Sequence, residues 1–339
     1  MSGGTGRDLG ALPKAHLHLH LEGAMRPSTL AELADRYGIA MPVVSGFGSF
    51  TAFADMYVGA CEVLRTADDL VRLINEVVDD AAQAGAVWIE PAFYQPRYRD
   101  RLGTDEQILE LFLDAIAAAG RRTGVGVGLM VAADRTVDPA EATAQARLAA
   151  RYAEAGVVSF GLANDEAVGP PEPFAEAYAI AREAGLLATP HAGELAGPES
   201  VLGALDALGA DRIQHGVRAV EDPSLVARLA DEGTCLDVCP TSNVLLAVVP
   251  SLDAHPLPAL LAAGVRCSVN ADDPLLFGPG LLEEYELCRD QFGFDDVTLA
   301  GIAATSIEAS GASPEQKAAG LAGVEAWRSG PPTWSRPAC

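Results

Sequence analysis

The chain has 339 residues, 49% of them hydrophobic, and a formal net charge of −24. This length is sufficient for a sizeable core, and the negative charge argues against nucleic acids and anionic membranes as partners. The sequence shows no run of eighteen apolar residues and no apolar signal-peptide core, and its six cysteines include no CxxC pair. We therefore expect a cytoplasmic protein with reduced thiols and no membrane span.

Short apolar runs recur along the chain and predict eight strands, at residues 15–20, 87–93, 125–131, 157–163, 186–191, 212–216, 234–239 and 266–271. Ala/Leu/Glu/Arg-rich stretches with helical spacing lie between them, and those at 140–156 and 171–185 each end at a glycine. Strands that alternate with helices indicate parallel βα units. Eight such units predict an α/β fold of the (β/α)8 TIM-barrel type, with a doubly wound open sheet as the alternative.

The interval from about residue 24 to 86 is too long for one helix. We expect extra helices inserted after the first strand, where such insertions usually cover the mouth of an active site. No internal repeat or low-complexity linker divides the sequence, so we predict a single domain over residues 1–339. Residues 1–12 and 329–339 are expected to be loose termini.

Histidines and acids are concentrated at the ends of four predicted strands, where catalytic groups of a barrel are found. A single histidine there would be more typical of a structural residue, but five of the six histidines in the chain occur in these segments. The candidates are His18, His20 and Glu22 at the end of the first strand, His191 and Glu194 at the end of the fifth, His215 at the end of the sixth, and Asp272 and Asp273 at the end of the eighth.

Three histidines alternate in the first strand, and we expect them to have two different roles. Alternate residues face the same side, so His18 and His20 lie about 7 Å apart at their Cα atoms and can converge on one ion. His16 extends the run to about 13 Å, which is too far for one ion to bind all three comfortably. We therefore expect His16 to lie deeper in the barrel, hydrogen-bonded to a neighbour.

Imidazole is the usual ligand of zinc, and a catalytic zinc site needs a position open to water. Two histidines of the first strand, one of the fifth and an aspartate of the eighth would complete such a site. Glu194 follows His191 by three residues on the same turn and is well placed to move a proton.

The motifs HxHLEG, HAGE, QHG, CPTSN and NADDP, in this order between Pro13 and about Ser310, resemble the adenosine deaminase family of the amidohydrolase superfamily. HxH alone is shared by many hydrolases, whereas HAGE followed by a histidine 24 residues after its own is specific. The resemblance implies a TIM barrel with one zinc ion held by His18, His20, His191 and Asp272.

The same resemblance implies a role for each remaining polar residue. Glu194 would protonate the purine N1, which makes C6 electrophilic. The zinc would lower the pKa of its bound water, and His215 would orient and assist the resulting hydroxide. Asp272 would also hydrogen-bond the attacking oxygen, and Asp273 would bind N7.

Four further residues match looser positions of the family. Glu22 lies where the family has an acid near the ribose hydroxyls, and Asn164 lies where a glycine amide contacts N3. Phe53 and Tyr57 match an aromatic pair that covers the substrate, although helix packing explains them equally well. We expect residues 239–243, CPTSN, to form a strand end with a helix cap rather than to contain a reacting group.

The chain departs from the family at several positions. His16 replaces an acid of the first strand, and Ala92 stands where many adenosine deaminases have an arginine. Arg97, Arg99 and Arg101 follow, in a loop expected on the active-site face. They either balance neighbouring acids or contact an anionic substituent of the substrate.

We therefore predict a zinc-dependent hydrolytic deaminase that converts a 6-aminopurine nucleoside, adenosine by default, to the 6-oxo product and ammonia. Alternatives are an aminodeoxyfutalosine deaminase of menaquinone biosynthesis, whose substrate carries a carboxylate, and deaminases of adenine or adenosine monophosphate. From another class, an amide or ester hydrolase is disfavoured by the HAGE glutamate, and a non-catalytic protein is expected to lack at least one ligand. The sequence leaves the N9 substituent, the oligomeric state and the pathway open.

Overall fold

The computed structural model describes residues 6–47 and 49–330. All eight predicted strands are present, and the third is divided at Gly128 into two short strands. A side chain at this glycine would collide with the side chains of Trp88 and Val158, which pack against its backbone. The strands are Lys14–His20 (β1), Ala86–Phe93 (β2), Gly126–Val127 (β3), Leu129–Asp134 (β4), Val157–Ala163 (β5), Leu187–Ala192 (β6), Arg212–His215 (β7), Cys235–Val238 (β8) and Arg266–Val269 (β9).

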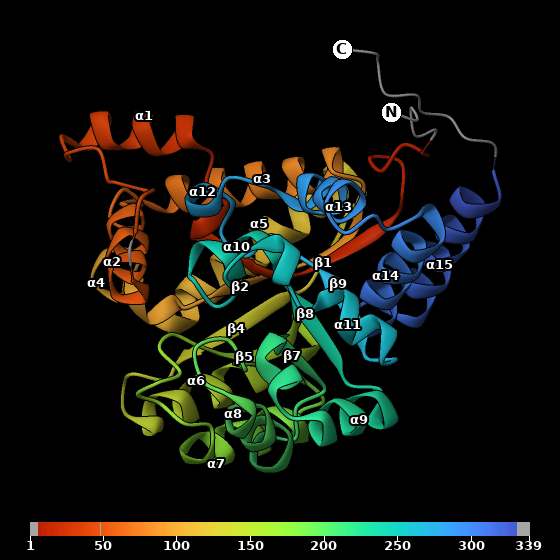
Figure 1. The fold of residues 1–339 in the computed structure, drawn as a ribbon. Coiled ribbons are helices and arrows are strands. Elements are labelled where there is room, and N and C mark those ends of the chain that lie inside the picture. The colour runs from red at the N-terminus through yellow and green to blue at the C-terminus, as the bar shows by residue number, and fades with distance from the viewer. Residues whose placement is uncertain (1–5, 48, 331–339) are drawn as a thin grey trace.

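The strands pair in parallel in the order β1-β2-β4-β5-β6-β7-β8-β9, with β3 beside β2. The first and last strands meet just beyond β9, where Leu19 and Asp272 form a parallel bridge. The Asp272 carbonyl accepts from His20 N at 3.1 Å, and Asp272 N donates to the His18 carbonyl at 3.2 Å. The prediction of a (β/α)8 barrel is confirmed, and the helices surround the strands (Figure 1).

Several helices begin at capping side chains, and several end at glycines. Thr66 and Thr104 form capping boxes, and Gly38, Gly124 and Gly233 end helices in the left-handed conformation that glycine adopts readily. The helices are Pro27–Tyr37 (α1), Phe50–Cys61 (α2), Ala67–Gln83 (α3), Arg99–Leu102 (α4), Asp105–Thr123 (α5), Pro139–Arg151 (α6), Ala175–Glu183 (α7), Pro198–Gly203 (α8), Pro223–Glu232 (α9), Pro240–Leu245 (α10), Leu257–Ala262 (α11), Pro274–Phe277 (α12), Leu281–Asp290 (α13), Asp296–Ala309 (α14) and Pro314–Ser329 (α15).

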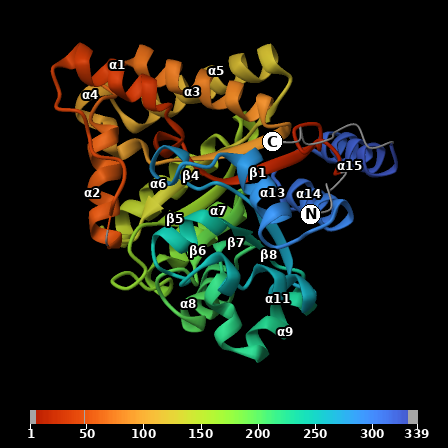
Figure 2. The ribbon, with the colours of Figure 1, turned by 45° about the horizontal axis from the view of Figure 1, so that its top comes forward.

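Three helices, α1 to α3, occupy the long interval between β1 and β2, as expected. Figure 2 shows α1 and α3 beside α5 on one side of the barrel. The contact between α1 and α3 includes a hydrogen bond of 2.6 Å from Thr29 Oγ1 to Glu76 Oε2. In contrast, α2 lies over the pocket at the carboxyl ends of the strands, where Phe53 and Tyr57 form part of the wall. The insertion therefore supplies one helix to the pocket.

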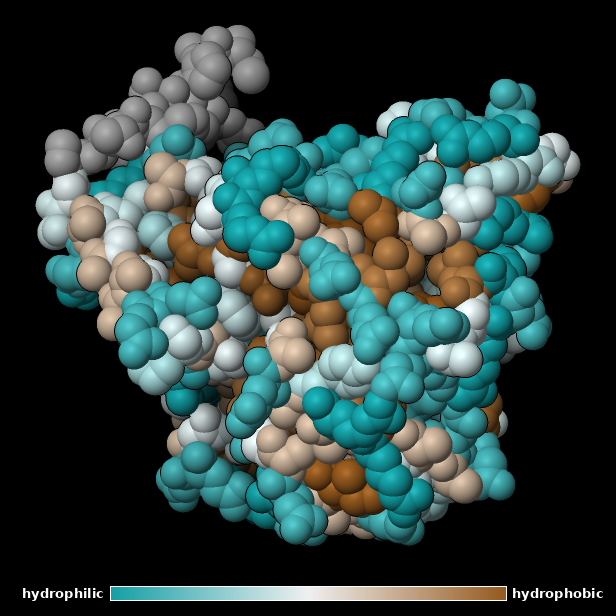
Figure 3. All heavy atoms as spheres, turned by 180° about the vertical axis from the view of Figure 1, so that it is seen from behind, coloured by the Kyte–Doolittle hydropathy of each residue, from teal (hydrophilic) through white to brown (hydrophobic). Residues whose placement is uncertain are grey.

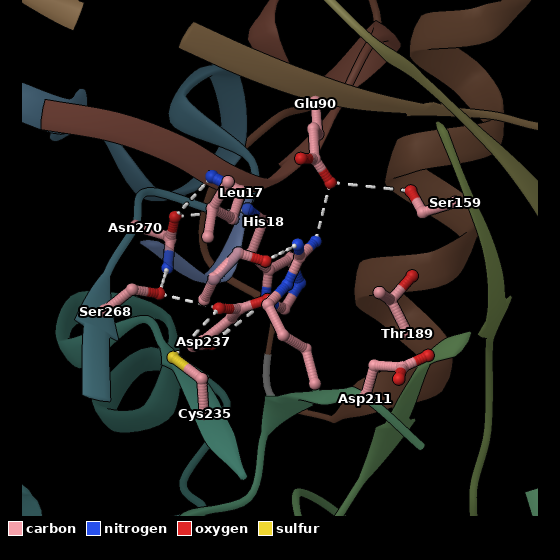
Figure 4. Close-up of polar contacts among 12 residues, drawn as sticks. Leu17, His18, Glu90, Ser159, Thr189, Asp211, Cys235, Asp237, Ser268 and Asn270 are labelled. Carbon is pink, nitrogen blue, oxygen red and sulfur yellow. Dashed lines mark hydrogen bonds and ion pairs between the residues drawn. The ribbon is translucent and has the colours of Figure 1, made fainter. Parts of the chain in front are cut away.

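A buried polar network lies among the strands beneath this pocket. The Arg212 guanidinium donates to Asp237 Oδ2 at 2.8 Å through Nε and to Glu90 Oε2 at 2.7 Å through Nη2. Figure 4 shows Ser268 and Asp237 in this network, with Ser268 Oγ donating to Asp237 Oδ1 at 2.7 Å. The Asp237 carbonyl lies 3.2 Å from His18 Nδ1, so the network holds β8 in place beside that ring.

The ends of the described chain are partly packed. Leu9 and Leu12 are buried, which differs from the loose N-terminus expected over residues 1–12. Residues 1–5 and 331–339 of the expected loose ends lie outside the described residues. Five cysteines, at positions 61, 235, 239, 267 and 288, are buried and free.

The surface agrees with the composition of the chain. Figure 3 shows hydrophilic residues spread over the rear face, with hydrophobic residues gathered near its centre. Within residues 6–47 and 49–330, no helix combines the length and the apolar character that crossing a membrane requires.

Candidate active site

The carboxyl ends of β1 and β6 and the residue Asp272 bring four ligand-type atoms together. His18 Nε2 lies 3.1 Å from His191 Nε2 and 3.3 Å from Asp272 Oδ1. His20 Nε2 lies 3.3 Å from each of the same two atoms. Bonds of about 2.0–2.2 Å to zinc in a tetrahedron place neighbouring ligand atoms about 3.3–3.6 Å apart. The spacing of this group, which we call the His/Asp cluster, fits one metal ion.

The outer contacts of the cluster direct lone pairs inward. His18 Nδ1 faces the Asp237 carbonyl at 3.2 Å, and His191 Nδ1 faces the Leu162 carbonyl at 3.0 Å. A carbonyl oxygen can only accept, so each ring carries its proton on Nδ1 and leaves Nε2 unprotonated, as a metal ligand requires. Asp272 Oδ1 is buried without a hydrogen-bond donor, whereas its other oxygen accepts from Ser242 Oγ at 2.7 Å.

His16 lies outside this cluster. Its Nε2 atom accepts from Ala271 N at 3.1 Å, and burial lowers the pKa of its ring to about 3. The ring is therefore a neutral acceptor that holds the backbone just before Asp272. This confirms that His16 is a buried residue hydrogen-bonded to a neighbour.

Glu194 and His215 lie beside the His/Asp cluster, with Glu194 Oε1 at 3.4 Å from His215 Nε2. Burial raises the pKa of Glu194 well above its usual value, and the charges of Asp272 and Glu166 raise it further. Burial therefore favours the protonated form of Glu194. Burial also lowers the pKa of His215, so this ring is neutral.

The turn that carries Glu194 is held by a single carboxylate, that of Glu166. Glu166 Oε2 accepts from Glu194 N at 2.8 Å, and Glu166 Oε1 accepts from Ser200 Oγ at 2.5 Å. Three more backbone N–H groups donate to the same side chain, from Gly193, Leu195 and Ala196. The position of Glu194 therefore depends on Glu166.

Asp273 also faces the pocket. Burial raises the pKa of its carboxyl well above the usual value, and the adjacent charge of Asp272 adds to this shift. Its Oδ1 atom is buried without a partner, which leaves it available to a ligand. Gly23 makes this position possible, because a Cβ atom there would lie 1.7 Å from Asp273 Oδ1.

Three non-glycine residues of the pocket have left-handed backbones: Asn164 at φ 84°, His215 at φ 64° and Asp272 at φ 61°. Such conformations are uncommon outside glycine and are concentrated at functional sites, where neighbouring structure enforces them. The left-handed Asn164 shows that asparagine adopts here the kind of conformation that glycine favours.

Phe53 and Tyr57 both line the pocket, and Phe53 stacks on Phe277 with ring centroids 5.3 Å apart. Glu22 is placed differently from the expectation, because its carboxylate does not line the pocket. Its two oxygens accept from Tyr57 Oη at 2.7 Å and from Tyr98 Oη at 2.6 Å. Its exposed fraction is 1%, so the acid that we expected near a sugar is buried against these two tyrosines.

The three arginines after β2 have different surroundings. Arg99 pairs with Asp105 at 2.6 Å, and Arg101 pairs with Glu62 at 3.2 Å. Arg97 lines the pocket, with its guanidinium 5.7 Å from the centre of the Tyr57 ring. Its Nε atom is buried without a hydrogen-bond partner, and Arg97 forms no ion pair with any residue in the described part of the chain.

Sequence reasoning missed several residues that touch this site. In CPTSN, Ser242 contacts Asp272, and Asn243 Nδ2 lies 3.1 Å from His215 Nδ1. The expected strand end lies one residue earlier, because β8 ends at Val238 and Pro240 already begins α10, and no side chain caps this helix. Glu166 was also missed, although it lies three residues after a predicted strand and an acid after a strand is the signal that identified Asp272. His255 was missed as well, because it lies outside the ends of the predicted strands.

Comparisons with known proteins agree with this geometry. The family model described as "Adenosine deaminase" matches residues 13–327. A putative adenosine/adenine deaminase of Streptomyces virginiae is 46% identical, covering 96% of this chain and 99% of that protein. An adenine deaminase of a Chelativorans species is 40% identical, covering 91% of this chain and 96% of that protein.

Solved structures support the same assignment. The adenine deaminase of Arthrobacter aurescens has a TM-score of 0.88 and is 33% identical, covering 94% of this chain and all of the other. A Burkholderia ambifaria amidohydrolase with bound Zn has a TM-score of 0.85 and is 30% identical, covering 94% and 90% of the two chains. The chain therefore belongs to the adenosine deaminase family and is a hydrolytic deaminase.

Proposed function

We propose that the chain is a zinc-dependent hydrolytic deaminase of a 6-aminopurine. The observation that supports this proposal is the His/Asp cluster, with metal-ligand spacing, beside two carboxyl groups whose pKa values are raised by burial. His18, His20, His191 and Asp272 would hold the ion. When bound, zinc lowers the pKa of a water molecule and so supplies a nucleophile at neutral pH.

The residues around the cluster divide the remaining work. Protonated Glu194 donates its proton to the purine N1, which makes C6 more electrophilic. Asp273, also protonated, donates a hydrogen bond to N7. His215 lies on the Glu194 side of the cluster and orients the attacking water. The hydroxyl group added at C6 passes its proton to the amino group, which leaves as ammonia as the C6=O bond of the 6-oxo purine forms. The proton released by the attacking water restores Glu194.

The N9 side of the pocket favours adenine over adenosine, the substrate predicted by default. Glu22, the acid expected near a sugar, does not line the pocket: its exposed fraction is 1%, and each of its oxygens accepts from a tyrosine hydroxyl. Similarity to curated adenine deaminases supports the same choice. The five buried free thiols support a reducing compartment, such as the cytoplasm.

A second candidate is a 6-aminopurine with an anionic group on its N9 side, including the aminodeoxyfutalosine considered above. The observation that favours it is Arg97, an arginine in the pocket wall without an ion-pair partner in the described residues. A substrate carboxylate bound to this guanidinium would contribute about 1.5–3 kcal/mol, or about 10- to 150-fold in kcat/KM.

The test is ammonia release from equal concentrations of adenine, adenosine, adenosine monophosphate, aminodeoxyfutalosine and 9-(2-carboxyethyl)adenine. The neutral carboxamide of the last compound is the matched control for its charge. We expect ammonia to be released faster from adenine than from adenosine. Activity on none of these purines, with zinc bound, would refute the proposed function.

Two variants separate the candidates. If Arg97 binds an anion, Arg97→Gln lowers kcat/KM for the carboxylate and leaves its carboxamide unchanged. Arg99→Gln is the control, because Arg99 is paired with Asp105 outside the pocket. An equal effect of the two variants, or equal rates for carboxylate and carboxamide, would contradict the second candidate and leave adenine as the proposal.

A further inference from the structure

His255, the one histidine outside the predicted strand ends, is connected to His215 through Asn243. Leu257 N donates to His255 Nδ1 at 3.1 Å, His255 Nε2 lies 3.2 Å from Asn243 Oδ1, and Asn243 Nδ2 lies 3.1 Å from His215 Nδ1. His255 and Asn243 are buried. These contacts link a backbone amide at the start of α11 to the active-site ring.

The direction of each hydrogen bond in this series follows from the first donor, the backbone N–H of Leu257. A backbone N–H can only donate, so His255 Nδ1 is unprotonated and the neutral ring carries its proton on Nε2. That proton needs an acceptor, which directs the Asn243 amide oxygen toward His255. The NH₂ group of Asn243 then faces His215, so Nδ1 of His215 accepts and its proton lies on Nε2.

Local sequence holds both relay residues in place. His255 precedes Pro256, which favours an extended backbone, and the ring indeed sits on a backbone of φ −69° and ψ 132°. Leu257 is the first residue of α11, and its N–H group has no acceptor within the helix, so His255 Nδ1 satisfies it. Asn243 lies in α10, where its carbonyl accepts from Val249 N at 3.0 Å.

We propose that Asn243 and His255 are positioning residues that fix His215 in its Nε2–H tautomer. His215 then presents a hydrogen-bond donor to the reacting oxygen, rather than a free lone pair. This is the reverse of His18 and His191, whose backbone-carbonyl partners leave Nε2 unprotonated. The tautomers thus separate two metal-ligand histidines from a neighbouring histidine that orients the nucleophile. The statement on rate rests on the proposed function, whereas the tautomer itself does not.

The first experiment measures the tautomer in the full-length protein as purified with its metal. Long-range ¹H–¹⁵N correlation spectra of ¹⁵N-histidine-labelled protein, assigned by difference with His215→Gln, report which ring nitrogen bears the proton. We expect Nε2–H at both His215 and His255. A proton on Nδ1 of His215 in the unaltered protein would overturn the proposal, and this result does not require any relay variant to fold.

The second experiment reverses the relay. Asn243→Asp replaces the donor that faces His215 by an acceptor, so we expect the proton of His215 to move to Nδ1. We expect kcat to fall at least about 10-fold, with a smaller change in KM, since a positioned proton-handling group typically contributes about 10²- to 10⁴-fold. An unchanged His215 spectrum in this variant would contradict the relay.

His255 is tested by a matched pair of variants. His255→Gln keeps a donor for Asn243 and an acceptor for Leu257 N, so we expect it to retain kcat within about threefold. His255→Leu removes both, and we expect a loss of at least about 10-fold. Asp253→Asn, at an exposed position of the same loop, controls for altered loop sequence. Equal kcat for the Gln and Leu variants would overturn the role of His255.

Discussion

Glu166 provides a sharp test of how the proposed acid, Glu194, is held. Its carboxylate accepts five hydrogen bonds, four from consecutive backbone N–H groups at residues 193–196 and one from Ser200 Oγ. Glu166→Ala removes all five acceptor contacts at once. Glu166→Gln keeps the shape of the side chain but removes the charge and points an NH₂ group at backbone donors.

The expected loss of stability follows from the burial of the donors. Gly193, Glu194 and Ser200 are buried, and each buried donor left without a partner costs about 1–3 kcal/mol. Leu195 and Ala196 are partly exposed, so water can replace the lost acceptor there. Water that enters the space left by the alanine substitution keeps the total low, and we expect Glu166→Ala to destabilise the protein by about 3–5 kcal/mol.

The same substitution changes the pH dependence of turnover. Burial, Asp272 and Glu166 raise the pKa of Glu194, in that order of importance. Glu166→Gln removes one of these contributions, so the pKa of Glu194 falls. Since the proposed acid must be protonated to donate, activity is lost at a lower pH as the pH rises.

The assays are urea unfolding for stability and the pH profile of kcat/KM for the acid. Glu199→Gln is the matched control, because Glu199 is exposed in the same turn and accepts from one backbone group, Gly197 N. If Glu166→Gln had the stability and pH profile of that control, the argument that Glu166 holds and tunes Glu194 would be wrong.

Three further predictions concern metal, proton and core. Elemental analysis should find about one zinc per chain, lost in His20→Ala but kept in His16→Ala. The His16→Ala substitution should lower the free energy of unfolding by about 1–3 kcal/mol, because Ala271 N loses its acceptor. Glu194→Gln should retain zinc and lower kcat at least about 10²-fold, and a near-normal kcat would exclude it as the acid. Arg212→Leu should destabilise the fold by about 3–5 kcal/mol, measured by urea unfolding, because it leaves two buried carboxylates unpaired.

The sequence predicted the residues that lie at strand ends, because one rule connects chain position with spatial position in a barrel. His18, His191 and Asp272 are far apart in sequence, yet parallel strands bring their carboxyl ends to one rim. His16 was distinguished from its neighbours by distance alone. Each of these inferences needed only the period of a strand and the order of the strands.

Other features depend on side-chain contacts that no periodicity encodes. The hydrogen bonds from Tyr57 and Tyr98 to Glu22 join three segments of the chain, and a comparison of sequence motifs cannot reveal them. The three arginines after β2 look equivalent in sequence, but only the structure shows which of them have acidic partners. His255 lies in a connecting segment, where residue type predicts no contact.

At the junction of β1 with β9, which we call the seam, side chains make many of the hydrogen bonds that join the two strands. Asn270 Oδ1 accepts from the backbone of Leu17 at 2.7 Å, and His16 Nε2 accepts from Ala271 N, in places where backbone carbonyls of neighbouring strands usually serve. Asp272, across the seam from His18 and His20, faces both rings. A metal ion bound there would therefore hold the two sides of this junction together. Removal of the metal ion should loosen the barrel at the junction of β1 with β9. We expect amide exchange to become faster at His20 and Asp272, and to change less where β4 pairs with β5.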